Sequence, residues 1–371
     1  TSNSTFLERF RIWNSLPFNI RWNYRDSKRH KSRALMTFLG VVGCTALLIS
    51  AFGLNDGIND SQDWYFNEIN HFESKLVISN DVESSQIDDI AQKVNGDKLM
   101  ESYIDIESNH EKTSGTLLVL NNTDLITPTN DNHEKIKIND DDISISKKMA
   151  DSLDIHIGDN VKWHIKGSDK WVDVKINKIH ADPSSQGLII TPNQLTELGL
   201  NYTPTSIITS EHVKGEYDGI KAVYSLEDMK KGWNELYQII LVLVYILIFF
   251  AIILAVIVIY NLLALSFLEM EYDITILKIL GFNNLFLTKL LAAQSLFFII
   301  LGILAGIPLG YYIQTLMWAS SSKRFYQVAS VSPTNLFSTG IIIFAVPMIV
   351  NLIFFYKIKN MDIVEESKIL E

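Results

Sequence analysis

The residue types that most often carry chemistry show no catalytic spacing in this chain. Its histidines are scattered, without the short regular intervals of a metal site. They are His30, His71, His110, His133, His156, His164, His180 and His212. We interpret them as solvated or structural, although His156 and His164 could approach each other across a turn at Gly158. Neither a Gly-x-Ser-x-Gly nor a His-Glu-x-x-His motif occurs, so we expect no metal site and no catalytic residue.

The sequence also lacks a nucleotide-binding motif. The Walker A pattern Gly-x-x-x-x-Gly-Lys-Ser/Thr, whose backbone amides cradle phosphates, does not occur. Gly and Asp are both common in turns, so we interpret Gly158-Asp159 as a turn rather than as a ligand site. The single cysteine, Cys44, excludes an intramolecular disulfide. We therefore expect a chain that is not an enzyme and binds no cofactor itself.

Four long apolar runs dominate the chain. They cover residues 34–54, 239–267, 290–318 and 336–356, and none contains Asp, Glu, Lys or Arg. About 20 apolar residues suffice for a helix to cross roughly 30 Å of hydrocarbon. A buried core helix is the alternative for any single run. Four together predict a polytopic membrane protein, whose uncharged spans argue against an ion or proton path.

The basic residues predict the orientation of these spans. Those before the first span are Arg9, Arg11, Arg21, Arg25, Lys28, Arg29, Lys31 and Arg33. Short flanks rich in Lys and Arg stay in the cytoplasm, so we expect both termini there. Lys323 and Arg324, between the third and fourth spans, would then face outward, which disagrees with the same rule. The eight basic residues before the first span outnumber these two.

The polar middle of the chain predicts a mixed fold. Short apolar runs alternate with turn residues, which favours strands at residues 75–79, 116–120, 161–165, 172–179 and 187–190, and helices at 84–94 and 147–153. The expected fold class is a polytopic α-helical membrane protein with four transmembrane helices and an extracytoplasmic α+β domain inserted between the first and second.

The expected organisation has nine segments. They are a cytoplasmic basic amphipathic segment (1–33), transmembrane helix 1 (34–54), the extracytoplasmic domain (55–236), transmembrane helix 2 (237–268), a cytoplasmic helix (269–289), transmembrane helix 3 (290–318), a short extracytoplasmic loop (319–335), transmembrane helix 4 (336–356) and a cytoplasmic tail (357–371). The chain begins with Thr1 rather than Met, so we expect it to be the second half of a longer protein or a truncated form.

Three glycines of the third span recur at every fourth residue. Gly302, Gly306 and Gly310 line one helix face and would allow another backbone to approach closely. Gly40 and Gly43 on the first span could supply a matching contact. The alternative is that glycine is simply common in membrane helices.

The segment after the second span reads as a short amphipathic helix. Ile274, Leu277, Lys278 and Gly281 are spaced to share one face, and Gly281 is a natural helix end. Such a helix could lie in the headgroup layer or bind a soluble partner.

Several segments together resemble the FtsX-like (MacB-type) ABC transporter permeases. They are residues 29–48 (RHKSRALMTFLGVVGCTALL), 269–282 (EMEYDITILKILGF), 357–368 (KIKNMDIVEESK) and the outer-domain stretch 143–161. The resemblance is to the C-terminal half of a Gram-positive-type permease. The helix after the second span differs from the family pattern in being more acidic. Family members usually carry basic residues where this chain has Met270, Glu271 and Tyr272.

The resemblance implies a role and partners. The cytoplasmic helix would dock on a separate ABC ATPase, which binds ATP-Mg, through Glu269, Asp273, Ile274, Leu277, Lys278, Gly281 and Phe282. The implied setting is the bacterial plasma membrane, with a second permease half or another copy of the chain, the lipid bilayer and an unknown extracytoplasmic client as partners, and no nucleic acid. ATP-driven motion would serve export, lipoprotein or peptide handling, or control of cell-wall enzymes. A membrane-anchored receptor or scaffold without ATPase coupling is the alternative.

Overall fold

A computed structural model describes residues 31–108, 111–215, 217–320 and 325–360 of the chain. Most of the basic cluster before the first span therefore lies outside the described residues. The same holds for Lys323, Arg324 and most of the predicted cytoplasmic tail.

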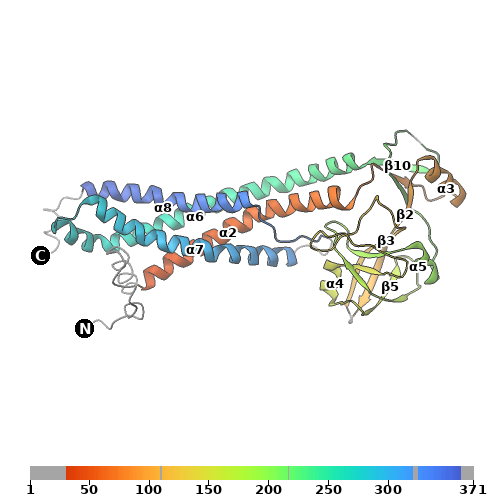
Figure 1. Cartoon of the computed structure of the whole chain (residues 1–371), viewed down its shortest axis with the longest axis horizontal. Coiled ribbons are helices and arrows are strands. Elements are labelled where there is room, and N and C mark those ends of the chain that lie inside the picture. Colours follow the sequence, from red (N-terminus) through yellow and green to blue (C-terminus); the bar gives the residue numbers. More distant parts are fainter. Residues whose placement is uncertain (1–30, 109–110, 216, 321–324, 361–371) are drawn as a thin grey trace. The chain divides into compact units, whose positions relative to one another are not determined.

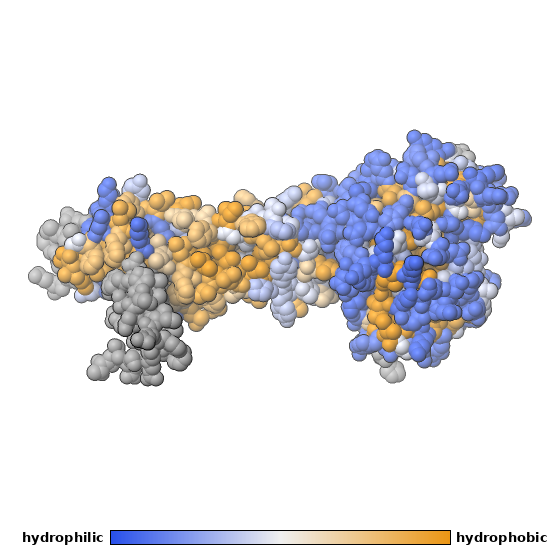
Figure 2. Space-filling model, in the orientation of Figure 1, coloured by the Kyte–Doolittle hydropathy of each residue, from blue (hydrophilic) through white to orange (hydrophobic). Residues whose placement is uncertain are grey.

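The chain folds into two compact units (Figure 1). The helical unit comprises residues 1–55, 243–315 and 330–371, and the sheet unit comprises residues 56–242 and 316–329. In Figure 2 hydrophobic residues cover most of the visible face of the helical unit, whereas the visible face of the sheet unit is mainly hydrophilic.

Four helices in the described part of the chain are long and apolar enough to cross a membrane. They are α2 (Lys31–Asp63), α6 (Leu226–Ile279), α7 (Asn284–Ser320) and α8 (Pro333–Asn360). Each contains one of the four predicted apolar runs. The fold class expected from the sequence is therefore confirmed.

The helices extend well beyond the predicted spans. Helix α6 has 54 residues, which at about 1.5 Å per residue gives roughly 80 Å, more than twice the hydrocarbon thickness. The structure shows no separate cytoplasmic helix at 269–289. Residues 269–279 continue α6, and residues 284–289 begin α7. No Gly or Pro interrupts α6 after its span, and the chain turns only at Gly281, whose φ of +89° suits glycine.

The four helices of the helical unit share one apolar core. Buried side chains from all of them form a single cluster, which includes Val41, Leu48, Ala255, Ile259, Phe267, Ile299, Ile343 and Val350. The side chains on the outer surface of the unit are also apolar, as expected for helices that face lipid.

The described part of the sheet unit contains a ten-stranded mixed sheet in the order β10-β1-β9-β2-β3-β8-β4-β7, to which β5 is added by pairing with β2 and β6 by pairing with β5. The strands are β1 (Ser74–Ile78), β2 (Asp97–Ser108), β3 (Glu111–Leu120), β4 (Ser144–Ser146), β5 (Asn160–Ile165), β6 (Val172–Lys175), β7 (Lys178–His180), β8 (Gly187–Ile190), β9 (Ser206–Thr209) and β10 (Ile220–Ser225). The short helices are η3 (Trp64–Ile69), α3 (Ser84–Lys93), α4 (Lys147–Leu153) and α5 (Pro192–Glu197).

The stretch from β4 to β5 forms the predicted strand, helix, turn and strand. Asp154 ends α4 in the left-handed region, and Gly158 has a φ of +104°. The carboxylate of Asp159 accepts a hydrogen bond of 2.7 Å from the backbone N–H of His156. Asp159 is thus engaged within the turn itself.

Two long helices connect to neighbouring strands at one edge of the sheet. Helix α2 passes through the π-helix η3 into β1, and β10 leads without a break into α6. Strands β1 and β10 pair antiparallel, with Ser74 opposite Ser225. The segment that leaves α2 and the segment that enters α6 are therefore held together by the pairing of β1 with β10.

Candidate functional site

The three glycines of α7 lie directly against α2. A Cβ atom added at Gly302 would stand 2.6 Å from a side-chain atom of Val41, and one at Gly310 would stand 2.6 Å from Ile49. At Gly306 it would stand 2.5 Å from Thr45 and 2.9 Å from the carbonyl oxygen of Val42. These contacts define a glycine seam in which the absence of side chains brings two helices together.

The seam continues with polar contacts toward the end of α7. The Ser50 hydroxyl donates to the carbonyl of Gly310 at 3.1 Å. The fully buried Gln314 amide donates to the carbonyl of Gly53 at 2.6 Å and to that of Ser330 at 3.1 Å. These bonds join α2, α7 and the segment before α8 inside the apolar bundle.

The expected partners of the seam need a correction. Gly40 packs against the side chain of Leu262 on α6 rather than against α7, and a Cβ on Gly43 would meet no described atom within 4 Å. Val41, Thr45 and Ile49 of α2 face the glycines of α7 instead. One helix of the seam therefore supplies glycines and the other supplies β-branched side chains.

The far ends of α6 and α8 are clamped together. The rings of Phe267 and Phe354 stack with centroids 4.5 Å apart. The ammonium of Lys357 lies 3.3 Å from the Glu271 carboxylate and 4.6 Å from the centroid of the Phe267 ring. Lys278 donates to the carbonyl of Ile358 at 2.7 Å, satisfying an acceptor near the C-terminus of α8. The last three turns of α6 thus pack on α8.

This clamp changes the interpretation of the predicted coupling residues. Ile274 and Leu277 are only 3% and 9% exposed and belong to the core of the helical unit. They cannot present an apolar face to a partner in this conformation, because α8 and the start of α7 already cover that face. Lys278 is engaged by α8 as described above.

The other predicted coupling residues lie closer to the surface. Glu269 is exposed and Asp273 is partly buried. Gly281 is exposed in the turn between α6 and α7, and Phe282 is 40% exposed.

The opposite face of the same helix end carries apolar residues that sequence reasoning missed. Their exposed fractions are 60% at Tyr272, 36% at Ile276, 49% at Ile279, 68% at Leu280 and 54% at Leu285. Together with Phe282 we call them the turn surface. Charged residues at 269, 271 and 273 precede most of this surface, which favours a position beyond the hydrocarbon. The helical spacing of 272, 276 and 279 was visible in the sequence and could have revealed it.

Aromatic residues hold the beginning of η3 within the sheet unit. The indole N–H of Trp64 donates to the Thr129 hydroxyl at 2.8 Å, and its ring stacks on His133 with centroids 4.2 Å apart. Tyr326 meets Trp64 edge to face. On the neighbouring helix, Trp233 stacks on the ring of Tyr65. Side chains from several parts of the sheet unit therefore hold the beginning of η3 in place.

A lysine of the sheet unit caps the end of α7. Lys148, on α4, donates to the carbonyls of Trp318 at 3.0 Å and Ala319 at 3.3 Å. Burial lowers the pKa of its ammonium. A positive charge at this position complements the negative end of the helix dipole.

The histidines do not assemble a site in the described residues. No group of three or more His, Cys, Asp or Glu side chains there is placed to hold a metal ion. The Nδ1 atom of His180 and the Ser144 hydroxyl lie 2.8 Å apart, a separation that a general base and its nucleophile would have. However, they are only 3% and 0% exposed, so a substrate could not reach them.

Four helices that can span a membrane, packed along a glycine seam and with a sheet domain inserted after the first, define a polytopic membrane protein. Residues 245–363 match the family model described as FtsX-like permease C-terminal. The chain therefore carries an FtsX-like permease C-terminal domain, as its motifs predict, and the match covers most of α6, α7 and α8. A search of curated proteins found no match.

The family match supports the general class of function. Permeases of this family are in general membrane subunits of ABC-type transporters, concerned with transport, and they generally work with an ABC ATPase. The family is generally non-enzymatic.

Proposed function

We propose that this chain is a transmitting permease subunit that carries ATP-driven motion from a separate ATPase to its sheet unit. One observation carries the proposal. Helix α6 runs without interruption from β10 at the sheet edge to the turn at Gly281, and the family match covers its second half. A continuous helix resists bending, so displacement at one end reaches the other.

The ATPase contact in this proposal is the turn surface, with Glu269 and Asp273 beside it. Exposed apolar residues next to charges suit a soluble partner that buries them. This revises the predicted contact, because Ile274 and Leu277 support the surface from below instead of touching the partner. ATP-Mg binds in the partner ATPase.

In this proposal, the motion transmitted by α6 acts on the strand pair β1 and β10. A shift of α6 against α2 would act on these strands directly, because each strand joins one of the two helices. The Gln62 amide also donates to Asn234 at 3.0 Å, linking α2 and α6 close to the sheet. A change in this strand pair would alter the grip of the sheet unit on its client.

The proposed setting is the plasma membrane of a bacterium, with both termini in the cytoplasm and the sheet unit, a MacB-like domain, outside. A second permease half or a second copy of the chain completes the transporter. The client is extracytoplasmic, and lipoproteins, peptides and cell-wall enzymes are the classes that we propose.

The test compares two leucines of α6 and the following turn. Leu280→Asp places a charge in the turn surface, and losing the burial of one leucine should cost about 1.5 to 3 kcal/mol. Binding to the co-purified ATPase should therefore weaken about tenfold or more, while the thermal stability of the permease stays unchanged. Leu277→Asp should instead unfold the helical unit, because it buries a charge in the core.

Ile157→Asp is the matched control, since Ile157 is 64% exposed on the sheet unit. It should leave ATPase binding intact. If Leu280→Asp retains full binding, the turn surface is not the coupling contact and a receptor without an ATPase gains support.

A further inference from the structure

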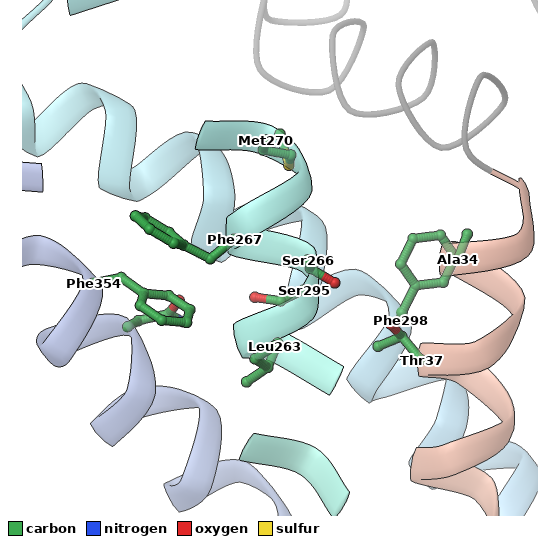
Figure 3. Close-up of a pocket in the computed structure, with 10 residues that line it drawn as sticks. Ala34, Thr37, Leu263, Ser266, Phe267, Met270, Ser295, Phe298 and Phe354 are labelled. Atoms are coloured by element: carbon green, nitrogen blue, oxygen red, sulfur yellow. The ribbon is translucent and has the colours of Figure 1, made fainter. Parts of the chain in front are cut away.

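A small cavity lies inside the helical unit, where all four long helices meet (Figure 3). Its lining residues are Ala34, Thr37, Leu263, Ser266, Phe267, Met270, Ser295, Phe298, Asn351 and Phe354. Three phenylalanine rings form much of the wall. Polar side chains from each helix interrupt this apolar lining, which is unusual inside spans that carry no charge.

One of these polar groups lacks a partner. The side-chain nitrogen Nδ2 of Asn351 is buried and has no hydrogen-bond partner among the described residues. A buried amide donor without an acceptor is costly, most of all in surroundings with no bulk water. Ser266 donates its hydroxyl proton to the carbonyl of Leu262 at 2.9 Å, so its oxygen can still accept.

The volume of the cavity decides what can satisfy the amide. It is about 30 Å³, whereas one water needs at least about 10 to 15 Å³. The cavity therefore has room for one or two waters and not for a lipid chain. Water also suits the lining, because a buried water commonly makes two to four hydrogen bonds to otherwise unsatisfied groups.

The cavity lies near the charged end of the spans. Ser266 precedes the charged residue Glu269 by three positions, and Asn351 precedes Lys357 by six. At about 1.5 Å per helical residue these separations are roughly 5 and 9 Å. The cavity therefore lies close to the end of the bundle that carries these charges, away from the middle of the spans.

We propose that this cavity is a water-binding site in which one or two waters accept from Asn351 Nδ2 and donate to Ser266 Oγ. Water then joins α8 to α6 at this level, whereas Gln314 joins helices by direct hydrogen bonds at the other end of the bundle. The site stands independently of the proposed ATPase coupling, because it rests only on the packing of the helical unit.

The test uses the full chain, labelled with ¹⁵N-asparagine, in lipid membranes. Solid-state NMR would measure magnetisation transfer from water to asparagine side-chain amides, and the signal lost in Asn351→Leu identifies Asn351. If that variant does not fold, Asn351→Gln removes the same signal while keeping an amide. We expect transfer from water to Asn351 as fast as to exposed asparagines. Absent transfer, or transfer from lipid protons alone, would overturn the proposal.

A second comparison tests the bridging partner. Ser266→Ala should slow water transfer to Asn351, because the bound water loses one acceptor. Ser338→Ala is the matched control, since Ser338 on α8 also donates to the carbonyl four residues earlier, at 2.8 Å, but is partly exposed and does not line the cavity. It should leave the transfer unchanged. Equal transfer in the Ser266→Ala variant and the unmodified chain would remove Ser266 from the site.

Discussion

At the scale of single residues, the missing side chain of a glycine determines how α2 and α7 meet. The seam tolerates no added methyl group, because the nearest neighbours include backbone carbonyl oxygens of α2 as well as side chains. Backbone cannot rotate away as a side chain can, so the helices themselves would have to separate.

Gly306→Ala should destabilise the helical unit by about 1 to 3 kcal/mol, the usual cost of overpacking. Gly340→Ala is the matched control on α8, where an added Cβ would meet no described atom within 4 Å. It should be neutral or stabilising by up to about 1 kcal/mol through helix propensity. Thermal unfolding of the two purified variants would measure the difference. Equal losses would show that the seam does not depend on close backbone contact.

A buried histidine should make the sheet unit sensitive to acid. Desolvation lowers the pKa of His180 from 6.5 to about 3, so the folded chain stays neutral where the unfolded chain takes up a proton. The stabilisation is complete above about pH 6.5 and falls as the pH decreases toward 3, by at most about 1.4 kcal/mol per pH unit.

His180→Asn should flatten this dependence, since asparagine can still bond the Ser144 hydroxyl but does not titrate. The free energy of unfolding of the sheet unit would be compared for the two proteins between about pH 4.5 and 6.5, above the range in which carboxylates dominate. Parallel curves would mean that His180 becomes protonated in the folded state.

At the scale of secondary-structure elements, lysines satisfy the ends of two long helices. Lys278 binds a terminal carbonyl of α8, and Lys148 binds two at the end of α7. Each joins one element to another through the helix terminus, where backbone acceptors would otherwise be unsatisfied.

Lys148→Met should loosen the last turn of α7 while keeping the apolar part of the side chain. A favourable charge at a helix C-terminus is worth about 0.3 to 2 kcal/mol, so backbone amides in this turn should exchange hydrogen about two- to thirtyfold faster. Hydrogen-exchange mass spectrometry of the peptide that contains Trp318 would detect it. Lys147→Met, which removes a neighbouring lysine paired with Asp151, should have no effect there. Equal exchange in both variants would contradict the capping role.

At the scale of the whole molecule, the basic residues before the first span predict the orientation of all four spans. Most of these residues lie outside the described part of the chain, so the prediction comes from the sequence.

Single cysteines at Ser168 and Asn283, each in a Cys44→Ala background, would report the orientation. An impermeant maleimide applied to intact cells should label position 168 in the sheet unit and leave position 283, in the turn between α6 and α7, unlabelled. Permeabilised cells provide the control, because both positions should then react. The reverse pattern on intact cells would invert the proposed topology.

The sequence alone predicted the features that depend on local periodicity and length. The four apolar runs, the α+β insertion and the short helix α4 are confirmed, because a span or an amphipathic element follows from its own residues. Strands β2, β9 and β10 were missed, since a strand is defined as much by its neighbours in the sheet as by its own residues. The spacing of Gly302, Gly306 and Gly310 showed that one face of α7 carries only small residues at these positions.

Only the tertiary structure decided which surfaces meet. The end of α6 has two apolar faces, one with Ile274 and Leu277 and one with Ile276 and Leu280. Helical spacing describes both equally well, so it could not indicate which face α8 would cover. Likewise, Asn351 and Ser266 are ordinary polar residues in their own helices. They share a cavity only because four helices, distant in sequence, pack around the same point.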